Sequence, residues 1–270
     1  MQQEKLPGEL MQIDLRDKRV LVTGGNSGLG AAMVRAFSAA GARVAINYLV
    51  HPEATDALLG ELKTAGHEAI GLQADVSDAG AVEAMFADLD KAWGGIDVLI
   101  SNAGIDGARA IGWESEIDAW SKVIDINLKG AYLCARQALK RMVSQGSGVV
   151  LNTTSVHEVI PWAGYSAYAA SKAGLSMMAK SLALEAAPFG VRVLCLAPGA
   201  IRTPINRAVW DNPEQYRDLL TKIPLGRIGE PEEIAGMAVM LASDGAAYLT
   251  GTTVFIDGGM TNYPAFAHGG

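Results

Sequence analysis

Short runs of β-branched and other apolar residues alternate with longer amphipathic stretches along the 270 residues of the chain. Short apolar runs are typical of buried strands, and apolar positions three or four residues apart are typical of helices. We predict seven strands, at residues 19–23, 44–48, 69–73, 97–101, 148–153, 191–196 and 252–256. We predict helices from the first strand to residue 40, and at 53–64, 79–93, 115–144 (one helix or two), 166–187 and 231–242.

Regular alternation of strands and helices indicates a parallel sheet with helices on both faces. The expected fold class is therefore α/β, a doubly wound domain of the Rossmann type around a central seven-stranded parallel sheet. No repeat, low-complexity tract or linker divides the chain, so residues 1–270 are expected to form a single domain. Residues 1–17 are a polar lead-in, and residues 206–225 are the natural candidate for a substrate loop.

Polar motifs directly follow several predicted strands, at the ends where open parallel sheets bind their ligands. We therefore expect them to line one edge of the sheet. The motifs are Thr23-Gly24, Asp75-Val76, Asn102-Ala103-Gly104, Ser155 and Pro198-Gly199.

The turn after the first strand is rich in glycine, with the spacing G-x-x-x-G-x-G. Glycines let the backbone turn tightly and approach a pyrophosphate at the N-terminus of the next helix. This spacing differs from the commonest dinucleotide fingerprint, but the physical requirement is similar. Because the turn opens a βαβ unit, we interpret it as a cofactor-binding turn that uses Gly24, Asn26, Ser27, Gly28, Leu29 and Gly30.

The end of the second strand bears on the choice between NAD and NADP. A carboxylate there would bind the ribose 2′-hydroxyl of NAD, whereas an Arg nearby would accommodate the 2′-phosphate of NADP. The segment Asn47-Tyr48-Leu49-Val50-His51 contains no carboxylate, Arg or Lys. His51 is either a weak aid to a phosphate or a surface residue of the loop. We predict that both NADP and NAD are accepted, with Asn47 and Tyr48 beside the cofactor.

Tyr168 and Lys172 lie four residues apart in the predicted helix 166–187, on one face and one turn from each other. An ammonium beside a phenol favours the phenolate and lowers the pKa of the phenol. Bringing that pKa to near neutrality needs roughly 4 kcal/mol, which a cation and a bound cofactor could supply together. Such a tyrosine is a general base for an alcohol. By itself, the pair could equally be two unrelated polar positions on an amphipathic helix.

Composition narrows the expected partners. The formal net charge is −7, and no cluster of Lys or Arg forms a footprint for nucleic acid. No apolar run approaches the ~20 residues of a membrane span, and the polar first residues lack the apolar region of a signal peptide. Cys134 and Cys195 stand in apolar stretches without metal-ligand spacing, so we expect no metal site and a reducing, cytoplasmic setting.

In their order along the chain, the motifs resemble those of the short-chain dehydrogenase/reductase family over essentially the full length. The resemblance rests on Thr23-Gly24-x-x-x-Gly28-x-Gly30, Asn102-Ala103-Gly104, the set Asn127, Ser155, Tyr168 and Lys172, and Pro198-Gly199. It implies an NAD(P)-dependent enzyme whose four catalytic residues are that set. Ser155 would bind the substrate oxygen, Tyr168 would take the hydroxyl proton, Lys172 would bind the nicotinamide ribose, and Asn127 would hold a water of a proton relay.

The same resemblance implies further cofactor contacts. These are Asp75 and Val76 beside the adenine, Asn102, Ala103 and Gly104 near the central sheet, Pro198 and Gly199, and Ile201 and Thr203 near the carboxamide.

Within the family, the stretches 155–162, 200–206, 229–234 and 257–266 are similar to bacterial glucose 1-dehydrogenases. This similarity implies oxidation of C1 of β-D-glucose or a related aldose to the lactone, by a homotetramer. His157 and Glu158 would join Ser155 and Tyr168 around the sugar, or else belong to a solvated loop. Arg202 stands beside the expected substrate pocket where that group carries Asn. Since a guanidinium only donates hydrogen bonds, it favours another sugar or a polar carbonyl compound.

Leu49 also departs from that group, which often has Arg after Asn-Tyr, and so argues against a strong preference for NADP. Two other functions stay open. A general carbonyl reductase or secondary alcohol dehydrogenase would share every catalytic residue. A non-catalytic dinucleotide sensor is disfavoured because all four catalytic positions are present. Whether the enzyme is a sugar dehydrogenase or a general carbonyl reductase or alcohol dehydrogenase, its expected partner is a small molecule.

Overall fold

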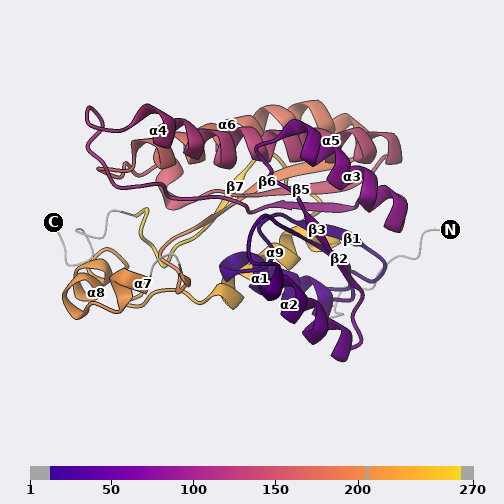
Figure 1. Ribbon diagram of the computed structural model, residues 1–270, viewed down its shortest axis with the longest axis horizontal. Helices are drawn as coiled ribbons and strands as arrows, with labels where there is room; N and C mark the ends of the chain where they lie inside the picture. The colour runs from indigo at the N-terminus through magenta and orange to yellow at the C-terminus, as the bar shows by residue number, and fades with distance from the viewer. Residues whose placement is uncertain (1–12, 205–206, 263–270) are drawn as a thin grey trace.

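The structure, a computed structural model, describes residues 13–204 and 207–262. Seven parallel strands form one sheet in the order β3-β2-β1-β4-β5-β6-β7 (Figure 1). All seven predicted strands are present, with ends shifted by two residues at most. Their bounds are β1 Arg19–Val22, β2 Arg43–Tyr48, β3 Ala69–Gln73, β4 Val98–Ser101, β5 Gly148–Thr153, β6 Val191–Pro198 and β7 Thr253–Ile256.

Helices cover both faces of the sheet, which gives the Rossmann-like fold that the alternation predicts (Figure 1). On one face lie α1 (Gly28–Ala39), α2 (Pro52–Thr64) and α9 (Pro231–Ala242). On the other lie α3 (Ala79–Trp93), α4 (Ile117–Ile124), α5 (Ala131–Gln145) and α6 (Ser166–Ala186). The strand order reverses between β1 and β4, where folds of this type bind dinucleotides.

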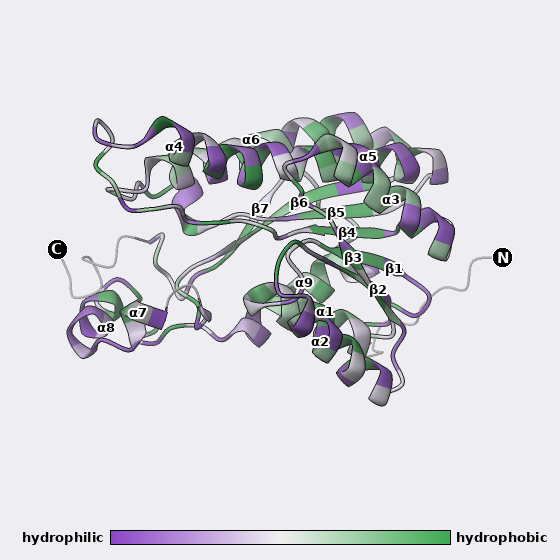
Figure 2. Cartoon of the chain, in the orientation of Figure 1, coloured by the Kyte–Doolittle hydropathy of each residue, from purple (hydrophilic) through white to green (hydrophobic). Residues whose placement is uncertain are grey.

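Residues of each central strand alternate between two apolar cores, because successive side chains of a strand point to opposite faces. Val20 and Val22 of β1 pack with residues of α1, α2 and α9, whereas Leu21 between them packs with residues of α3, α5 and α6. All three are fully buried. Burial on both faces explains why the strands read as continuous apolar runs, which Figure 2 shows as green arrows between mixed helices.

The long stretch predicted as one helix or two between 115 and 144 is broken in its middle. A π-helical turn, Asp125–Gly130, separates α4 from α5. π turns inside helices frequently mark functional sites. Here the turn contains Asn127, and periodicity alone does not reveal it.

The proposed substrate loop contains two short helices that the sequence analysis did not predict, α7 (Arg207–Trp210) and α8 (Pro213–Leu220). Residues 205 and 206 lie outside the described part. A signal for α8 was present, because the Asn212 side chain accepts hydrogen bonds from the N–H groups of Glu214 and Gln215, and Pro213 occupies the first helical position. Figure 1 shows both helices beyond the C-terminal ends of the strands.

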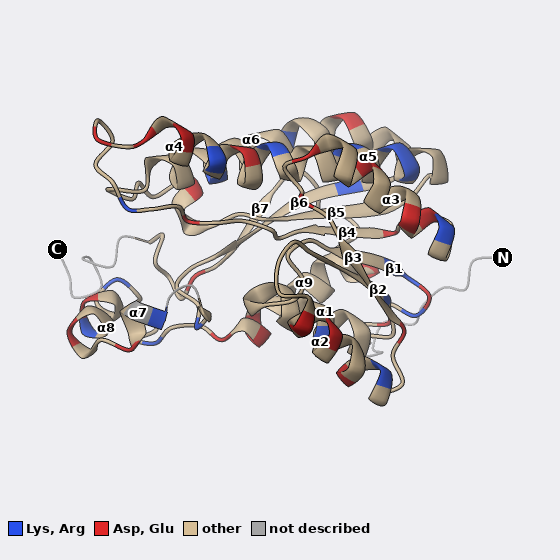
Figure 3. Cartoon of the chain, viewed as in Figure 1, with Lys and Arg blue, Asp and Glu red and all other residues tan. Residues whose placement is uncertain are grey.

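The outer helices carry charges of both signs, which Figure 3 shows interspersed along α3, α5 and α6. Within the described residues, no helix combines the length and the hydropathy that crossing a lipid bilayer requires.

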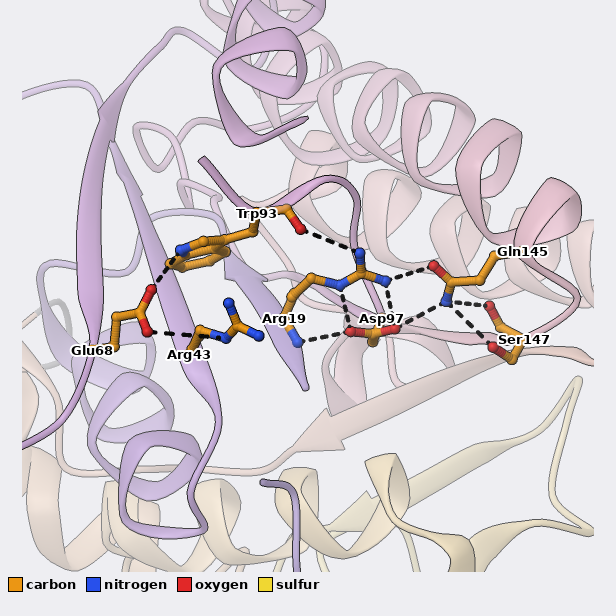
Figure 4. A network of polar contacts seen from close by, with 7 residues as sticks. All are labelled: Arg19, Arg43, Glu68, Trp93, Asp97, Gln145 and Ser147. Carbon is orange, nitrogen blue, oxygen red and sulfur yellow. Dashed lines mark hydrogen bonds and ion pairs between the residues drawn. The ribbon is translucent and has the colours of Figure 1, made fainter. Parts of the chain in front are cut away.

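A polar network joins β1 to β4 at the amino-terminal ends of these strands (Figure 4). The polar motifs lie at the opposite, carboxyl-terminal ends. The Arg19 guanidinium donates to both carboxylate oxygens of Asp97, at 2.7 and 2.9 Å, and Gln145 donates to Asp97 as well. Burial alone would raise the pKa of Asp97, but the hydrogen bonds from Arg19 outweigh burial and lower it. This network fixes the two strands whose other ends carry the glycine turn and Asn102.

Candidate active site

The glycine turn after β1 needs glycine at three places. Gly24 and Gly28 have φ angles of +59° and +50°, which side-chain-bearing residues rarely adopt. At Gly30 a Cβ atom would overlap the carbonyl oxygen of Gly24 and come within 2.8 Å of Nδ2 of Asn102. The first turn of α1 therefore packs directly against the backbone of the turn.

The N-terminus of α1 suits an anionic cofactor. The first N–H groups of a helix have no acceptor within it, and the Ser27 side chain makes no capping hydrogen bond to them. Gly28 lies opposite Thr203, because an added Cβ would be 3.9 Å from Cβ of Thr203, an ordinary van der Waals distance. A backbone with free N–H groups, opposite the segment after β6, fits a pyrophosphate.

Replacing Gly30 with alanine is expected to destabilise the fold by about 3 kcal/mol and to weaken coenzyme binding, because the new methyl group meets backbone that cannot move aside. The matched control is Gly60→Ala in α2, where nothing lies within 4 Å and helix propensity favours alanine by about 0.5–1 kcal/mol. Denaturant unfolding and fluorescence titration with NADH and NADPH measure both effects. Wild-type coenzyme affinity in Gly30→Ala would contradict this reading of the turn.

Two asparagines connect the glycine turn to β2, one from the strand and one from the turn itself. Oδ1 of the buried Asn47 accepts from the N–H of Gly24 at 3.3 Å, and its Nδ2 donates to the carbonyls of Leu72 and Ala74. Nδ2 of Asn26 donates to the carbonyl of Val50 at 2.9 Å. Asn47 therefore positions the turn, and its amide is engaged by the backbone.

The other residues at the end of β2 and β3 lie where the sequence placed them. Tyr48 ends β2 and is half-buried, and Leu49 is 51% exposed. Asp75 accepts from the N–H and the hydroxyl of Ser77 through Oδ1, which shapes the turn after β3. Val76 is buried against Gly130 of the π turn.

Asn102 and Thr23, both from motifs expected at this end of the sheet, join the ends of β4 and β1. The Thr23 hydroxyl accepts from the N–H groups of Asn102 and Ala103, at 2.9 and 3.0 Å. In return Nδ2 of Asn102 donates to the carbonyl oxygens of Thr23 and Gly24.

Ser155, Tyr168 and Lys172 come together at the end of β5. Ser155 is buried and opens a 3₁₀ turn, Val156–Glu158, while Tyr168 and Lys172 lie on α6. Nζ of Lys172 donates to the carbonyl of Thr153 at 2.8 Å and lies 5.6 Å from the centroid of the Tyr168 ring. The Ser155 hydroxyl lies close enough to Tyr168 to lower the pKa of its phenol.

Burial sets the proton affinities of this cluster in the chain alone. It raises the pKa of Tyr168 to about 12, against the Ser155 hydroxyl, which lowers it. It lowers the pKa of Lys172 to about 8, against the charges of Asp106 and Glu158 among others. The lysine therefore does not by itself turn Tyr168 into a base at neutral pH, because its ammonium faces Thr153 and the phenol is desolvated.

Asn127 is buried in the π turn, and its amide is fully used. Oδ1 accepts from the N–H of Ile105, while Nδ2 donates to the carbonyl of Ile105 and to the hydroxyl of Ser171, at 2.9 and 3.1 Å. Ser171 in turn donates to the carbonyl of Tyr168 at 2.7 Å. Asn127 thus connects the segment after β4 to the helix that carries Tyr168.

Aromatic rings line one side of Tyr168. The His157 ring stacks on Trp162 with centroids 4.4 Å apart, and Trp162 stacks on Tyr165 at 4.0 Å. The Tyr168 ring meets His157 and Trp162 edge-on. Nδ1 of His157 lies 3.0 Å from the carbonyl of Ile160. The stack fixes His157 next to the tyrosine.

Two of the residues expected at the substrate are directed elsewhere. Oε1 of Glu158 accepts from the hydroxyl of Ser176 on α6 at 3.1 Å, and its Oε2 is buried. Arg202 donates to Glu230 at 3.0 Å, and its guanidinium lies over the Trp210 ring of α7 at 5.2 Å. The structure therefore gives Arg202 an anchoring role for the loop rather than an open position at the cluster.

The segment after β6 crosses the end of the sheet. Pro198 ends β6, and Gly199 lies so close to Asp257 that an added Cβ would be 2.7 Å from its Cα. Ile201 is buried and bridges to Gly229, and Thr203 is buried opposite the glycine turn. One further residue, Asp106, lies near Lys172 and Tyr168 and was not among the residues expected from the sequence.

Comparisons with known proteins agree with this arrangement. A family model described as enoyl-(acyl carrier protein) reductase matches residues 24–261. The protein named 3beta-hydroxysteroid dehydrogenase 1 of Eggerthella lenta is 45% identical over 96% of this chain and 99% of its own length. The protein named glucose 1-dehydrogenase 2 of Bacillus subtilis is 38% identical over 94% of this chain and 99% of its own length.

Among solved structures, a gluconate 5-dehydrogenase from Burkholderia cenocepacia J2315 in complex with NADP and tartrate has a TM-score of 0.89 at 31% identity. The match covers 93% of this chain and 98% of that one. With the glycine turn, the Asn-Ala-Gly segment and the Ser155, Tyr168 and Lys172 cluster at one sheet edge, these similarities place the protein in one family. The chain belongs to the short-chain dehydrogenases/reductases.

Proposed function

We propose that this protein is an NAD(P)-dependent oxidoreductase that acts on a hydroxyl group of a ring carbon. The observation that carries the proposal is the junction of Ser155, Tyr168 and Lys172 at the sheet edge that also bears the glycine turn. A bound nicotinamide coenzyme would exchange a hydride with the carbon that bears the hydroxyl. The four residues expected to be catalytic therefore keep their proposed roles.

The side chains of the cluster would handle the proton. Ser155 would bind the substrate oxygen, and Tyr168 would take its proton while the carbon loses hydride. Because burial raises the pKa of Tyr168 in the chain alone, the positive charge of the oxidised coenzyme must favour the phenolate. The amide of Asn127 is engaged by Ile105 and Ser171, so we place the relay water at its main-chain carbonyl.

We propose that both NAD and NADP are used. Support comes from the exposed Leu49 after Tyr48, where neither a carboxylate nor a cation stands. The exposed His51 pairs with Glu53 at 3.0 Å, so it offers little attraction to a 2′-phosphate. The cofactor contacts expected of Asp75, Val76, Ile201 and Thr203 remain part of the proposal.

For the substrate, we propose C1 of β-D-glucose or a related aldose, with the lactone as product. The similarity to glucose 1-dehydrogenase 2 and the polar groups of His157 and Asp106 near Tyr168 support this choice. The second candidate is a secondary alcohol such as a 3β-hydroxysteroid. It is favoured by the 45% identity to the Eggerthella lenta protein and by the exposed apolar side chains of Val159 and Leu225.

We also propose that residues 1–270 act as one catalytic domain and that the chain is a cytoplasmic homotetramer. The exposed Met177 and Leu184 on α6 support contacts between subunits, and the unpaired, buried Cys134 and Cys195 support a reducing setting. Residues 207–225 would be the described part of the substrate loop, which Arg202 anchors through Trp210.

The test is turnover by the purified protein with NAD⁺ and with NADP⁺. The substrates are D-glucose, cyclohexanol and a 3β-hydroxysteroid, and the absorbance of reduced nicotinamide measures the rate of each reaction. We expect activity with both coenzymes and the highest kcat/KM for D-glucose. A preference for the steroid would select the second candidate. No turnover of any of these ring compounds would refute the proposed function.

A further inference from the structure

The position of Asp106 is set by the catalytic cluster itself. The preceding residue, Ile105, is held through both its N–H and its carbonyl by the Asn127 amide, each at 2.9 Å. Two residues before Asp106, a Cβ added to Gly104 would lie 3.2 Å from Oδ1 of Asn127 and 3.7 Å from Nζ of Lys172. The chain from β4 therefore passes directly over the catalytic residues before it reaches Asp106.

The Asp106 carboxylate is half-buried and unpaired. Across residues 13–204 and 207–262, no side chain or N–H group forms a hydrogen bond or an ion pair with it. Burial raises its pKa, against the positive charge of Lys172, which lowers it. A carboxylate withdrawn from water without donors is costly, so its position favours a ligand that supplies a donor.

The neighbouring polar side chains donate elsewhere and form no hydrogen bond with Asp106. Lys172 donates to the carbonyl of Thr153. Because the carbonyl of Ile160 can only accept, the hydrogen of the neutral His157 ring is on Nδ1, and Nε2 is an acceptor. Burial lowers the pKa of His157, which keeps the ring neutral at pH 7. The site thus offers two acceptors, Asp106 and Nε2 of His157, beside Tyr168.

We propose that Asp106 is a substrate-binding residue that accepts a hydrogen bond from a hydroxyl other than the reacting one. This inference rests on the proposed function and narrows its substrate class to polyhydroxylated rings. A compound with one hydroxyl uses Ser155 and Tyr168 and leaves Asp106 unpaired. A sugar satisfies Asp106 as well, and a hydrogen bond to a charged group is worth about 1.5–3 kcal/mol, or roughly 10- to 150-fold in kcat/KM.

The test compares D-glucose with cyclohexanol in three proteins: wild type, Asp106→Asn and Asp106→Leu. We expect kcat/KM for D-glucose to fall about 10-fold in Asp106→Asn, which keeps a neutral acceptor, and about 100-fold in Asp106→Leu. The ratio of kcat/KM for D-glucose to kcat/KM for cyclohexanol should fall as well, mainly because KM for D-glucose rises. The matched control is Asp118→Asn, an exposed aspartate of α4, which should leave the ratio at its wild-type value.

Two results would overturn the inference. One is an equal loss for both substrates in the Asp106 variants, which would mean that the residue only supports the fold or the catalytic cluster. The other is a wild type that prefers cyclohexanol to D-glucose, which would leave the proposed function intact. A wild type without activity on either compound or on the steroid would instead refute the proposed function. Higher D-glucose turnover in Asp106→Glu than in Asp106→Leu would support the role of the Asp106 carboxylate as a hydrogen-bond acceptor.

Discussion

Replacing Tyr168 with phenylalanine is expected to lower kcat about 10³-fold while leaving coenzyme binding near its wild-type value. The substitution removes the hydroxyl that we propose exchanges the proton, and general acid–base groups typically contribute 10²–10⁴-fold. The ring itself stays, so the edge-on contacts with His157 and Trp162 are kept and the fold should not change. Steady-state kinetics with the best ring substrate measures the loss, and fluorescence titration measures coenzyme affinity.

The pH profile separates a lost base from a disturbed site. Because burial raises the pKa of Tyr168 to about 12 in the chain alone, wild-type kcat/KM for oxidation should increase with pH as the phenolate forms. The residual activity of Tyr168→Phe should not follow that rise. The matched control is Tyr165→Phe, in the same aromatic stack, which should retain activity within a few-fold. Wild-type turnover by Tyr168→Phe would show that another group is the base.

Replacing Lys172 with methionine is expected to abolish most activity and to stabilise the protein at pH 7. Turnover should fall about 10²–10³-fold, because the substitution removes a buried cation that lies next to the phenol and that we propose binds the nicotinamide ribose. Burial lowers the pKa of Lys172 from 10.5 to about 8, so keeping it charged costs the folded state about 3 kcal/mol below pH 8. Losing the hydrogen bond to Thr153 costs about 1 kcal/mol of stability, so the net gain in the free energy of unfolding is about 2 kcal/mol.

The sign of the pH dependence is a sharp check on this result. In the wild type the cost is complete below pH 8 and disappears as pH rises towards 10.5, because the unfolded lysine then loses its proton as well. The advantage of Lys172→Met in denaturant unfolding should therefore shrink between pH 8 and pH 10. Lys180→Met, at an exposed position of the same helix, should change neither activity nor this dependence. A less stable Lys172→Met at pH 7 would contradict the argument.

Much of the fold follows from local patterns, because apolar runs that are buried on both faces can only be central strands. The side chains of Val20 and Val22 pack into one core and that of Leu21 into the other, which a surface strand could not do. The meeting of Thr23 with Asn102 follows as well, since both stand at the carboxyl ends of neighbouring strands. The meeting of Ser155 with Tyr168 and Lys172 was predictable for the same reason, as Ser155 and α6 both follow β5.

Side-chain direction was harder to predict, because it depends on partners far away in the sequence. Arg202 turns to Glu230, 28 residues later, and Glu158 turns to Ser176, 18 residues later. The π turn around Asn127 has no signature in the hydrophobic period, and it places the amide against Ile105. Asp106 was missed for a related reason: its position depends on that contact, and a single aspartate in a loop carries no pattern.

The junction of β1 with β4 also has a consequence for how this protein acquires its activity during folding. Val20 pairs with Val98, and Arg19 meets Asp97, 78 residues along the chain. Closing so long a loop has an entropic cost that local helices do not bear. The glycine turn gains Asn102 as its neighbour only once that loop is closed. A newly made chain can therefore have most of its helices and still be unable to hold a coenzyme.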